Sequence, residues 1–158
     1  MRKILTLLFI SLLVCCSAQA AEKIPVKIIP AENISTTHDE IQIGDNLLFK
    51  VKNDVYYNKK IIFAKDTKVV GYVSFFDENG WANDNAEIQL SQFKLRNTSG
   101  DLITIKSTVT LNGFELLKTK GKRILQFFNY IGVGFRGKEV DIKYGVDKPE
   151  FTIWYVKN

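Results

Sequence analysis

After residue 41 the chain alternates apolar and polar residues with a period of two far more often than with the 3.6-residue period of a helix. Leu47, Phe49 and Val51 fall on one face of such a segment and Lys50 on the other. Aromatic and β-branched residues dominate the alternating positions, as half-buried strands require. The pattern predicts an all-β fold, a small β-barrel or β-sandwich of about eight or nine mostly antiparallel strands.

Polar turn signals separate the predicted strands. Asn58-Lys59-Lys60 interrupts an apolar run and predicts the tip of a hairpin. The Gly-containing segment 97–101 predicts a second turn, which joins long strands at Glu87–Leu95 and Leu102–Leu111.

One apolar segment fits two structures. Residues 121–134 contain Ile124, Leu125, Phe127, Phe128 and Ile131, whose spacing suits a short helix about as well as a buried strand. A short helix near residues 122–131 is therefore kept as an alternative to a strand.

The last apolar segment, residues 151–156, is predicted to be a strand. Phe151, Ile153 and Tyr155 share one face, and the other face is also rich in large side chains, Trp154 among them. This composition predicts a final strand that is covered on both sides.

The N-terminal residues have the pattern of a secretory signal peptide. Arg2 and Lys3 precede an apolar run, Ile4–Val14, which is too short to anchor the chain stably in a bilayer. Ala18-Gln19-Ala20 then fits a small-x-small cleavage site. Residues 1–20 are thus predicted to be a signal peptide, and the mature chain to start at Ala21.

The mature chain is expected to consist of two parts. Residues 21–40 contain two of the three prolines and a polar run, and we expect an edge strand at Ile24–Ile29 followed by a loop. Residues 41–158 are expected to form a single all-β domain.

Both cysteines, Cys15 and Cys16, lie inside the predicted signal, so the mature chain carries no thiol, disulfide or cysteine metal site. Lipidation of one of them is the less favoured alternative. The residues that precede them, Val14 and Cys15, are not the small residues expected before a lipidated cysteine.

Charge narrows the choice of partner. The formal net charge of +5 falls to +3 when Arg2 and Lys3 leave with the signal peptide. Basic and acidic residues are mixed along the chain, which argues against a nucleic-acid partner. No apolar stretch of transmembrane length follows the signal. The pattern predicts an exported protein of the periplasm or the extracellular space.

Residues 54–73 carry a resemblance. The sequence Asp54-Val55, a short turn, the apolar strand Ile61–Phe63 and Val70-Gly71 resemble a pattern of exported bacterial envelope domains. The segment is similar, more distantly, to the outer-membrane-complex barrel subunit of type IV secretion systems. It departs from that pattern at Ala64 and Asp66, where proline and glycine are expected. The resemblance implies a β-barrel or β-sandwich in the cell envelope and supplies no catalytic residues.

The most oxygen-rich loop of the sequence contains Asp77, Glu78, Asn79 and Asp84. Carboxylate and amide oxygens are ligands for calcium, but the spacing does not match a twelve-residue calcium loop. Trp81 lies in the same loop and offers a large contact face for a sugar ring or a partner protein. These five residues are the candidate binding site, and a solvated loop with Trp81 folded back onto the barrel rim is the simpler interpretation.

A basic cluster of Lys118, Lys120, Lys122 and Arg123 is a candidate for weak contact with anionic lipid headgroups or acidic glycans. A solvated turn is again the simpler interpretation. The only histidine, His38, lies beside Asp39 and Glu40, and a metal site usually needs three or four convergent ligands. We expect no metal site, no cofactor and no catalytic residue.

These observations favour a secreted or periplasmic non-enzymatic envelope module that binds another envelope component, in first place a protein. One alternative is a carbohydrate-active or calcium-dependent hydrolase that uses Asp77, Glu78 and Asp84. The other is a soluble inhibitor or a carrier of a small apolar ligand, with Phe49 and Phe63 among the aromatic residues of its interior. An exposed aromatic residue or strand edge favours the binding module, convergent acids in a cleft favour the enzyme, and an enclosed apolar cavity favours the carrier.

Overall fold

The computed structural model describes residues 21–37, 41–80, 85–113 and 137–157. These residues are all-β and contain ten strands and no helix. The predicted fold class is therefore confirmed, while the alternative helix near residues 122–131 lies outside the described residues. The strands are β1 (Glu22–Pro30), β2 (Ile34–Ser35), β3 (Asn46–Val51), β4 (Val55–Tyr57), β5 (Lys60–Phe63), β6 (Lys68–Asp77), β7 (Glu87–Arg96), β8 (Leu102–Asn112), β9 (Asp141–Ile142) and β10 (Phe151–Lys157).

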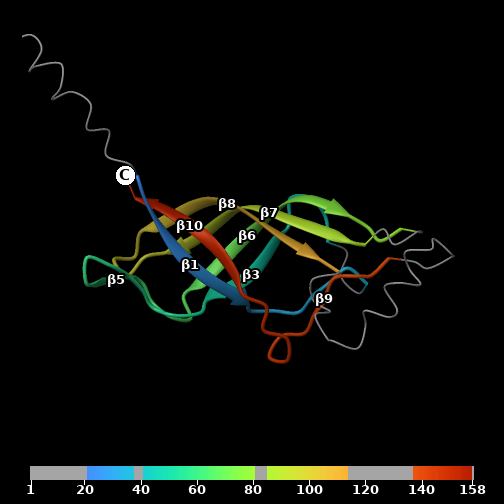
Figure 1. The fold of residues 1–158 in the computed structure, drawn as a ribbon, viewed down its shortest axis with the longest axis horizontal. Helices are drawn as coiled ribbons and strands as arrows, with labels where there is room; N and C mark the ends of the chain where they lie inside the picture. The colour runs from blue at the N-terminus through green and yellow to red at the C-terminus, as the bar shows by residue number, and fades with distance from the viewer. Residues whose placement is uncertain (1–20, 38–40, 81–84, 114–136, 158) are drawn as a thin grey trace, which may run out of the picture.

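Six strands form one antiparallel sheet in the order β10-β1-β3-β6-β7-β8. Its two outermost strands, β8 and β10, lie side by side, so the sheet curls into a nearly closed barrel (Figure 1). The start of β1 and the end of β10 also lie side by side, because Glu22 of β1 is the pairing partner of Lys157 of β10.

A short hairpin of β4 and β5 packs at one end of this barrel. The β7–β8 turn holds it, since Thr98 donates hydrogen bonds from its backbone N–H to the Ile62 carbonyl (3.0 Å) and from its hydroxyl to the Ile61 carbonyl (2.8 Å). Phe63 of the hairpin meets Tyr155 of β10 edge to face, with the ring centroids 5.3 Å apart. The hairpin therefore links the first half of the chain to its last strand.

The other end of the barrel is joined to residues 137–142. The N–H of Thr36 donates to the Val140 carbonyl and the N–H of Ala86 to the Lys138 carbonyl, both at 2.9 Å. A Cβ atom on Gly113 would lie 2.4 Å from the Lys138 carbonyl oxygen, so only glycine permits this close backbone approach. β2 and β9 pair in the same region.

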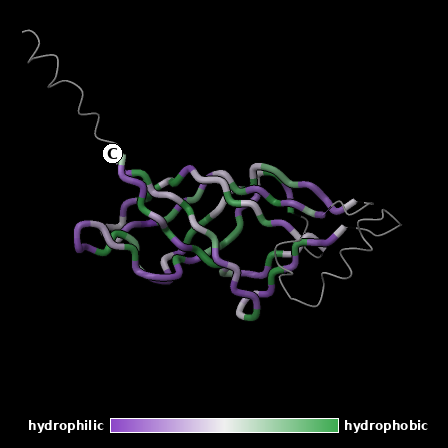
Figure 2. The backbone as a smooth tube through the Cα atoms, viewed as in Figure 1, coloured by the Kyte–Doolittle hydropathy of each residue, from purple (hydrophilic) through white to green (hydrophobic). Residues whose placement is uncertain are grey.

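The inward-facing residues of the strands form one apolar core, and Figure 2 shows the hydrophobic positions alternating with hydrophilic ones along the strands. Phe49 lies at its centre. Its ring meets Phe93 and Phe151 edge to face at centroid distances of 6.3 and 6.2 Å, a favoured aromatic geometry. The barrel interior is therefore filled with packed side chains along β3, β7 and β10.

Two expectations about individual strands differ from the structure. The predicted edge strand at Ile24–Ile29 is β1, and it lies between β10 and β3 in the sheet. Only residues 28–30 pair with β3, however, so most of β1 has a single hydrogen-bonded neighbour. The sequence of residues 21–40 does not show that the distant C-terminal strand returns to pair with it.

The final strand was expected to be covered on both faces. Ile153 is fully buried on the inner face, but Trp154 and Val156 are 47 and 43 % exposed on the outer face. Both faces of the strand carry large apolar side chains, as predicted. However, no described element covers the outer face.

Candidate functional site

The outer surface of β1 and β10 presents an apolar centre. Trp154 is the pairing partner of Pro25, and Val156 is the partner of Lys23. Proline cannot donate a ladder hydrogen bond and is therefore normally confined to sheet edges. Pro25 is tolerated because β1 has a hydrogen-bonded neighbour only on the β10 side at this position. We refer to this surface as the β1–β10 face; it consists of Lys23, Pro25, Lys27, Thr152, Trp154 and Val156, all of them exposed.

Cations surround the apolar centre. Lys23 and Lys27 lie two positions on either side of Pro25 on β1. The neighbouring strand β8 exposes Leu102 and Lys106 and contains no acidic residue, and β10 contains none either. Trp154 therefore lies on a strand beside the exposed lysines of β1, and the exposed acid of β1 is its first residue, Glu22.

Glu150 lies just before β10, two residues from Thr152 of this face. Its carboxylate forms ion pairs with Lys52 and, at 3.8 Å, with Lys27. The hydrogen bond from Lys52 holds the pKa of Glu150 below its ordinary value of 4.5; desolvation opposes this effect, and the charges of Lys52 and Lys27 lower the pKa further. These two ion pairs tie the start of β10 to β1 and to the segment after β3.

Part of the loop that the sequence analysis selected lies at the barrel end that contacts residues 137–142. Asp77 closes β6 and Glu78 follows it, and both side chains are exposed. The Asn79 side chain donates a hydrogen bond to the Gly137 carbonyl (2.9 Å), so this residue has a structural role. Trp81 and Asp84 lie outside the described residues.

The basic cluster of Lys118, Lys120, Lys122 and Arg123 also lies outside the described residues, as does His38. Within residues 21–37, 41–80, 85–113 and 137–157, no group of three or more His, Cys, Asp or Glu side chains is placed to hold a metal ion. The same part of the chain forms no helix long and apolar enough to cross a membrane.

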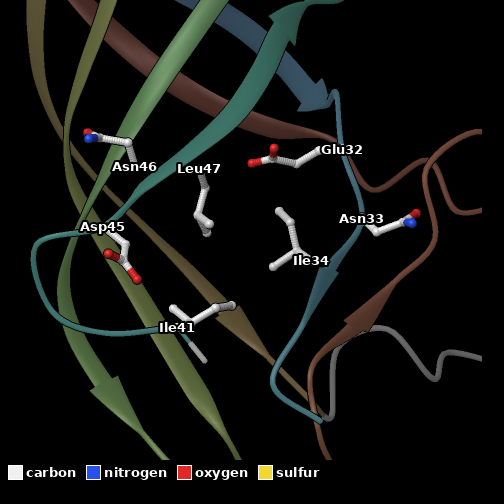
Figure 3. A pocket seen from close by; sticks show the side chains of 7 residues that line it. All are labelled: Glu32, Asn33, Ile34, Ile41, Asp45, Asn46 and Leu47. Carbon is white, nitrogen blue, oxygen red and sulfur yellow. The ribbon is translucent and has the colours of Figure 1, made fainter. Parts of the chain in front are cut away.

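A pocket of about 290 Å³ opens where the chain passes from β1 to β2 and from β2 to β3 (Figure 3). Ile34, Ile41 and Leu47 form its floor, and none of them is more than 7 % exposed. The polar residues around it are Glu32, Asn33, Asp45 and Asn46.

The two acids of the pocket are each held by a backbone N–H. Glu32 Oε1 accepts a hydrogen bond from Leu48 N–H (2.6 Å), and Asp45 Oδ2 accepts one from Gln42 N–H (2.7 Å). Asn33 turns instead toward the β9 side, where its Oδ1 accepts from Tyr144 N–H (2.8 Å). The pocket therefore combines an aliphatic floor with two oriented carboxylates.

The sequence analysis missed both of these features as sites. The alternation of residues 151–156 placed Trp154 on the correct strand face, but the fold was needed to show that this face is open. The pocket gave no sequence signal, because its lining comes from two segments whose pattern is that of ordinary strand and loop residues.

Comparison with protein-family models gave no match to this chain, and a search of curated proteins gave none either.

Proposed function

We propose that this chain is an exported, non-enzymatic module of the bacterial cell envelope that binds another envelope protein through the β1–β10 face. The signal-peptide pattern of residues 1–20 supports export. The resemblance of residues 54–73 to exported envelope domains supports the compartment.

The exposure of Trp154 on a rigid strand is the observation that carries the proposal. Tryptophan is enriched among the few residues that dominate binding energy in protein interfaces, and such residues cluster at the centre of a contact surrounded by polar residues. Trp154, Pro25 and Val156 form such a centre, and Lys23 and Lys27 lie at its edge.

The charge of the surface indicates the character of the partner. Lys23 and Lys27 are exposed on either side of Pro25, and Lys106 is exposed on β8; the acids near the face are Glu22, the first residue of β1, and Glu150, which pairs with Lys27. An acidic partner surface is attracted to such a positively charged patch, whereas a basic partner surface is repelled by it. We therefore take the partner to be a protein with an acidic contact region.

Two observations favour this function over the alternatives. Phe49 and Phe63, the aromatic residues suggested for a ligand-carrying interior, are packed against other rings in the core. Asp77 and Glu78, suggested for a hydrolase, are exposed at the end of β6.

Site-specific photo-crosslinking in the native envelope tests the proposal. A benzophenone amino acid at Thr152, which neighbours Trp154 on the exposed face, is expected to give one discrete adduct with a protein. The adduct should weaken severalfold when Trp154 is replaced by alanine, since removal of a central interface tryptophan costs about 2 kcal/mol or more. It should also weaken at high salt.

The control is the same photo-reactive residue at Tyr144, which is 51 % exposed but lies in the loop before β10 and away from the face. An equal adduct from Tyr144 would contradict the assignment of the surface. An adduct that survives Trp154→Ala, or one formed with lipid or glycan in place of protein, would contradict the proposed function.

A further inference from the structure

The pocket between the β1–β2 link and the start of β3 has a composition suited to one class of ligand. Its floor of Ile34, Ile41 and Leu47 is apolar and buried, while Glu32 and Asp45 supply negative charge at its edge (Figure 3). From these features we infer that the pocket binds an organic cation with an aliphatic body, namely the alkylammonium group that a lysine side chain presents.

A backbone hydrogen bond orients each carboxylate, at an exposed position for Asp45 and a half-buried one for Glu32. Each acid uses one oxygen to accept a backbone N–H, Leu48 N–H for Glu32 and Gln42 N–H for Asp45. A carboxylate has acceptor sites on both oxygens, so each acid retains capacity for a second donor. Fixing the side chains in advance reduces the entropy cost of binding.

No described cation neutralises these acids. The ion pairs among the described residues involve Asp66, Asp141 and Glu150, and neither Glu32 nor Asp45 takes part in one. A bound ammonium group would therefore gain a charge-assisted contact with a carboxylate without displacing a described protein cation.

The shape and chemistry argue for an alkylammonium ion in preference to a metal ion. Calcium requires six to eight oxygen ligands, whereas the aliphatic side chain of Leu47 lies between the two carboxylates of the pocket. Asn33 and Asn46 point away from those side chains, so their amides do not complete a ring of oxygens over the floor. Methylene groups can lie on the aliphatic floor while the ammonium group reaches a carboxylate, as lysine side chains do on protein surfaces.

The pocket volume fits a ligand of this size. A volume of about 290 Å³ is at the lower end of the range for pockets that hold drug-sized molecules, so the occupant is a single side chain or a small amine. The proposal does not depend on the β1–β10 face, which involves different residues.

A titration followed by ¹H–¹⁵N NMR tests the inference with the mature chain. N-acetyl-lysine methylamide is the probe, and N-acetyl-norleucine methylamide is its uncharged match. The lysine probe is expected to shift the Leu48 and Gln42 amide signals saturably, with a Kd on the order of 1 mM for so small a ligand. The norleucine probe should produce no saturable shift at these amides.

Two isosteric variants identify the acids that bind. Glu32→Gln and Asp45→Asn keep an oxygen for the backbone N–H but remove the charge, and each is expected to weaken binding about threefold or more. Asp54→Asn is the matched control, because Asp54 likewise accepts a backbone N–H, that of Lys65 at 2.6 Å, but lies beyond the opposite end of β3. It should leave the affinity unchanged.

Two further titrations identify the source of the ammonium group and the competing ion. Cadaverine binding as tightly as the lysine probe would support a free amine as the natural ligand, and weaker cadaverine binding would support a lysine of a peptide chain. Saturable shifts with calcium chloride but not with the lysine probe would overturn the inference. Equal binding of the norleucine probe, or unchanged binding by both acid variants, would overturn it as well.

Discussion

The Glu150 carboxylate shows how one residue can tie neighbouring strands of the sheet together. It lies between Lys27 of β1 and Lys52, which follows β3, and it immediately precedes β10. All three side chains are well exposed, so the energy of this contact is reduced by solvent screening. Its value lies in position, because the contact joins three neighbouring strands at the place where β10 begins.

This contact predicts a pH effect whose sign follows from the pKa. The pKa of Glu150 is lowered in the folded state, first by the hydrogen bond from Lys52, so the unfolded chain holds the proton more tightly. The contribution to stability is complete above the unfolded value of about 4.5 and is lost as the pH falls through the lower folded value. A ¹³C NMR titration of the Glu150 carboxyl should give a pKa below 4.5.

Lysine variants separate the causes. Lys52→Met should remove most of the lowering of the Glu150 pKa, and Lys27→Met should remove less. Lys94→Met, at an exposed position of β7, is the control and should leave the pKa of Glu150 unchanged. A larger effect from Lys27 than from Lys52 would contradict this account of the contact.

At the scale of an element, the β4–β5 hairpin contains a local conflict between residue type and backbone conformation. Its two turn residues, Asn58 and Lys59, have φ angles of 48° and 64°. Two positive φ angles in a two-residue loop match the right-handed twist of the flanking strands, and asparagine followed by glycine is the preferred sequence there. Lysine at the second position is therefore strained.

Replacing Lys59 with glycine should stabilise the protein by about 0.5 kcal/mol, because relief of the left-handed conformation outweighs the added freedom of the unfolded chain. Lys60→Gly is the control. Lys60 is the first residue of β5 and pairs with Tyr57, so glycine there should destabilise the protein by a similar amount. Urea unfolding measures both changes, and a destabilised Lys59→Gly variant would contradict the strain argument.

The hairpin also shows which elements the sequence predicts well. Its tip at Asn58-Lys59-Lys60 and the pairing of β7 with β8 across residues 97–101 were both predicted, because a turn signal between alternating segments is local information. The position of β1 was predicted less well. Its second neighbour is the last strand of the chain, and no local pattern reports such a distant pairing.

The candidate sites depend even more on distant contacts. Trp154 is exposed because no other described element packs over its face of the sheet. The pocket requires the segments of Glu32 and Asp45 to lie side by side, because both segments contribute to its floor. Residue chemistry alone drew attention to the loop of Asp77 and Glu78, where acids are close in sequence but exposed in the structure.

At the scale of the whole molecule, the barrel depends on its last strand. β10 fills the space between β1, with which it is hydrogen-bonded, and β8, beside which it lies. It also contributes Phe151, Ile153 and Tyr155 to the core, where they meet Phe49 and Phe63. Burying a side chain as fully as Ile153 contributes about 1.5–3 kcal/mol, and the half-buried Phe151 and Tyr155 each add less.

Deleting β10 should therefore destabilise the barrel, whereas moving β10 to the start of the sequence should not. A mature chain that ends at Glu150 is expected to lose cooperative unfolding, because β1 loses its partner along residues 22–28 and the core loses three side chains. A circular permutant that joins Lys157 to Glu22 by a short Gly-Ser linker keeps both, since these two residues already pair.

The permutant is best opened between Gly145 and Val146. Val146 is 75 % exposed, and the hydrogen bonds of this turn are local, from Val146 and Asp147 N–H to the Lys143 carbonyl. Its stability should stay within about 2 kcal/mol of the uncut chain, because loop breaks at exposed turns remove few contacts. Near-ultraviolet circular dichroism and urea unfolding measure the folding of both the truncated chain and the permutant. A truncated chain as stable as the full one, or a permutant without a cooperative transition, would show that barrel closure by β10 does not control folding.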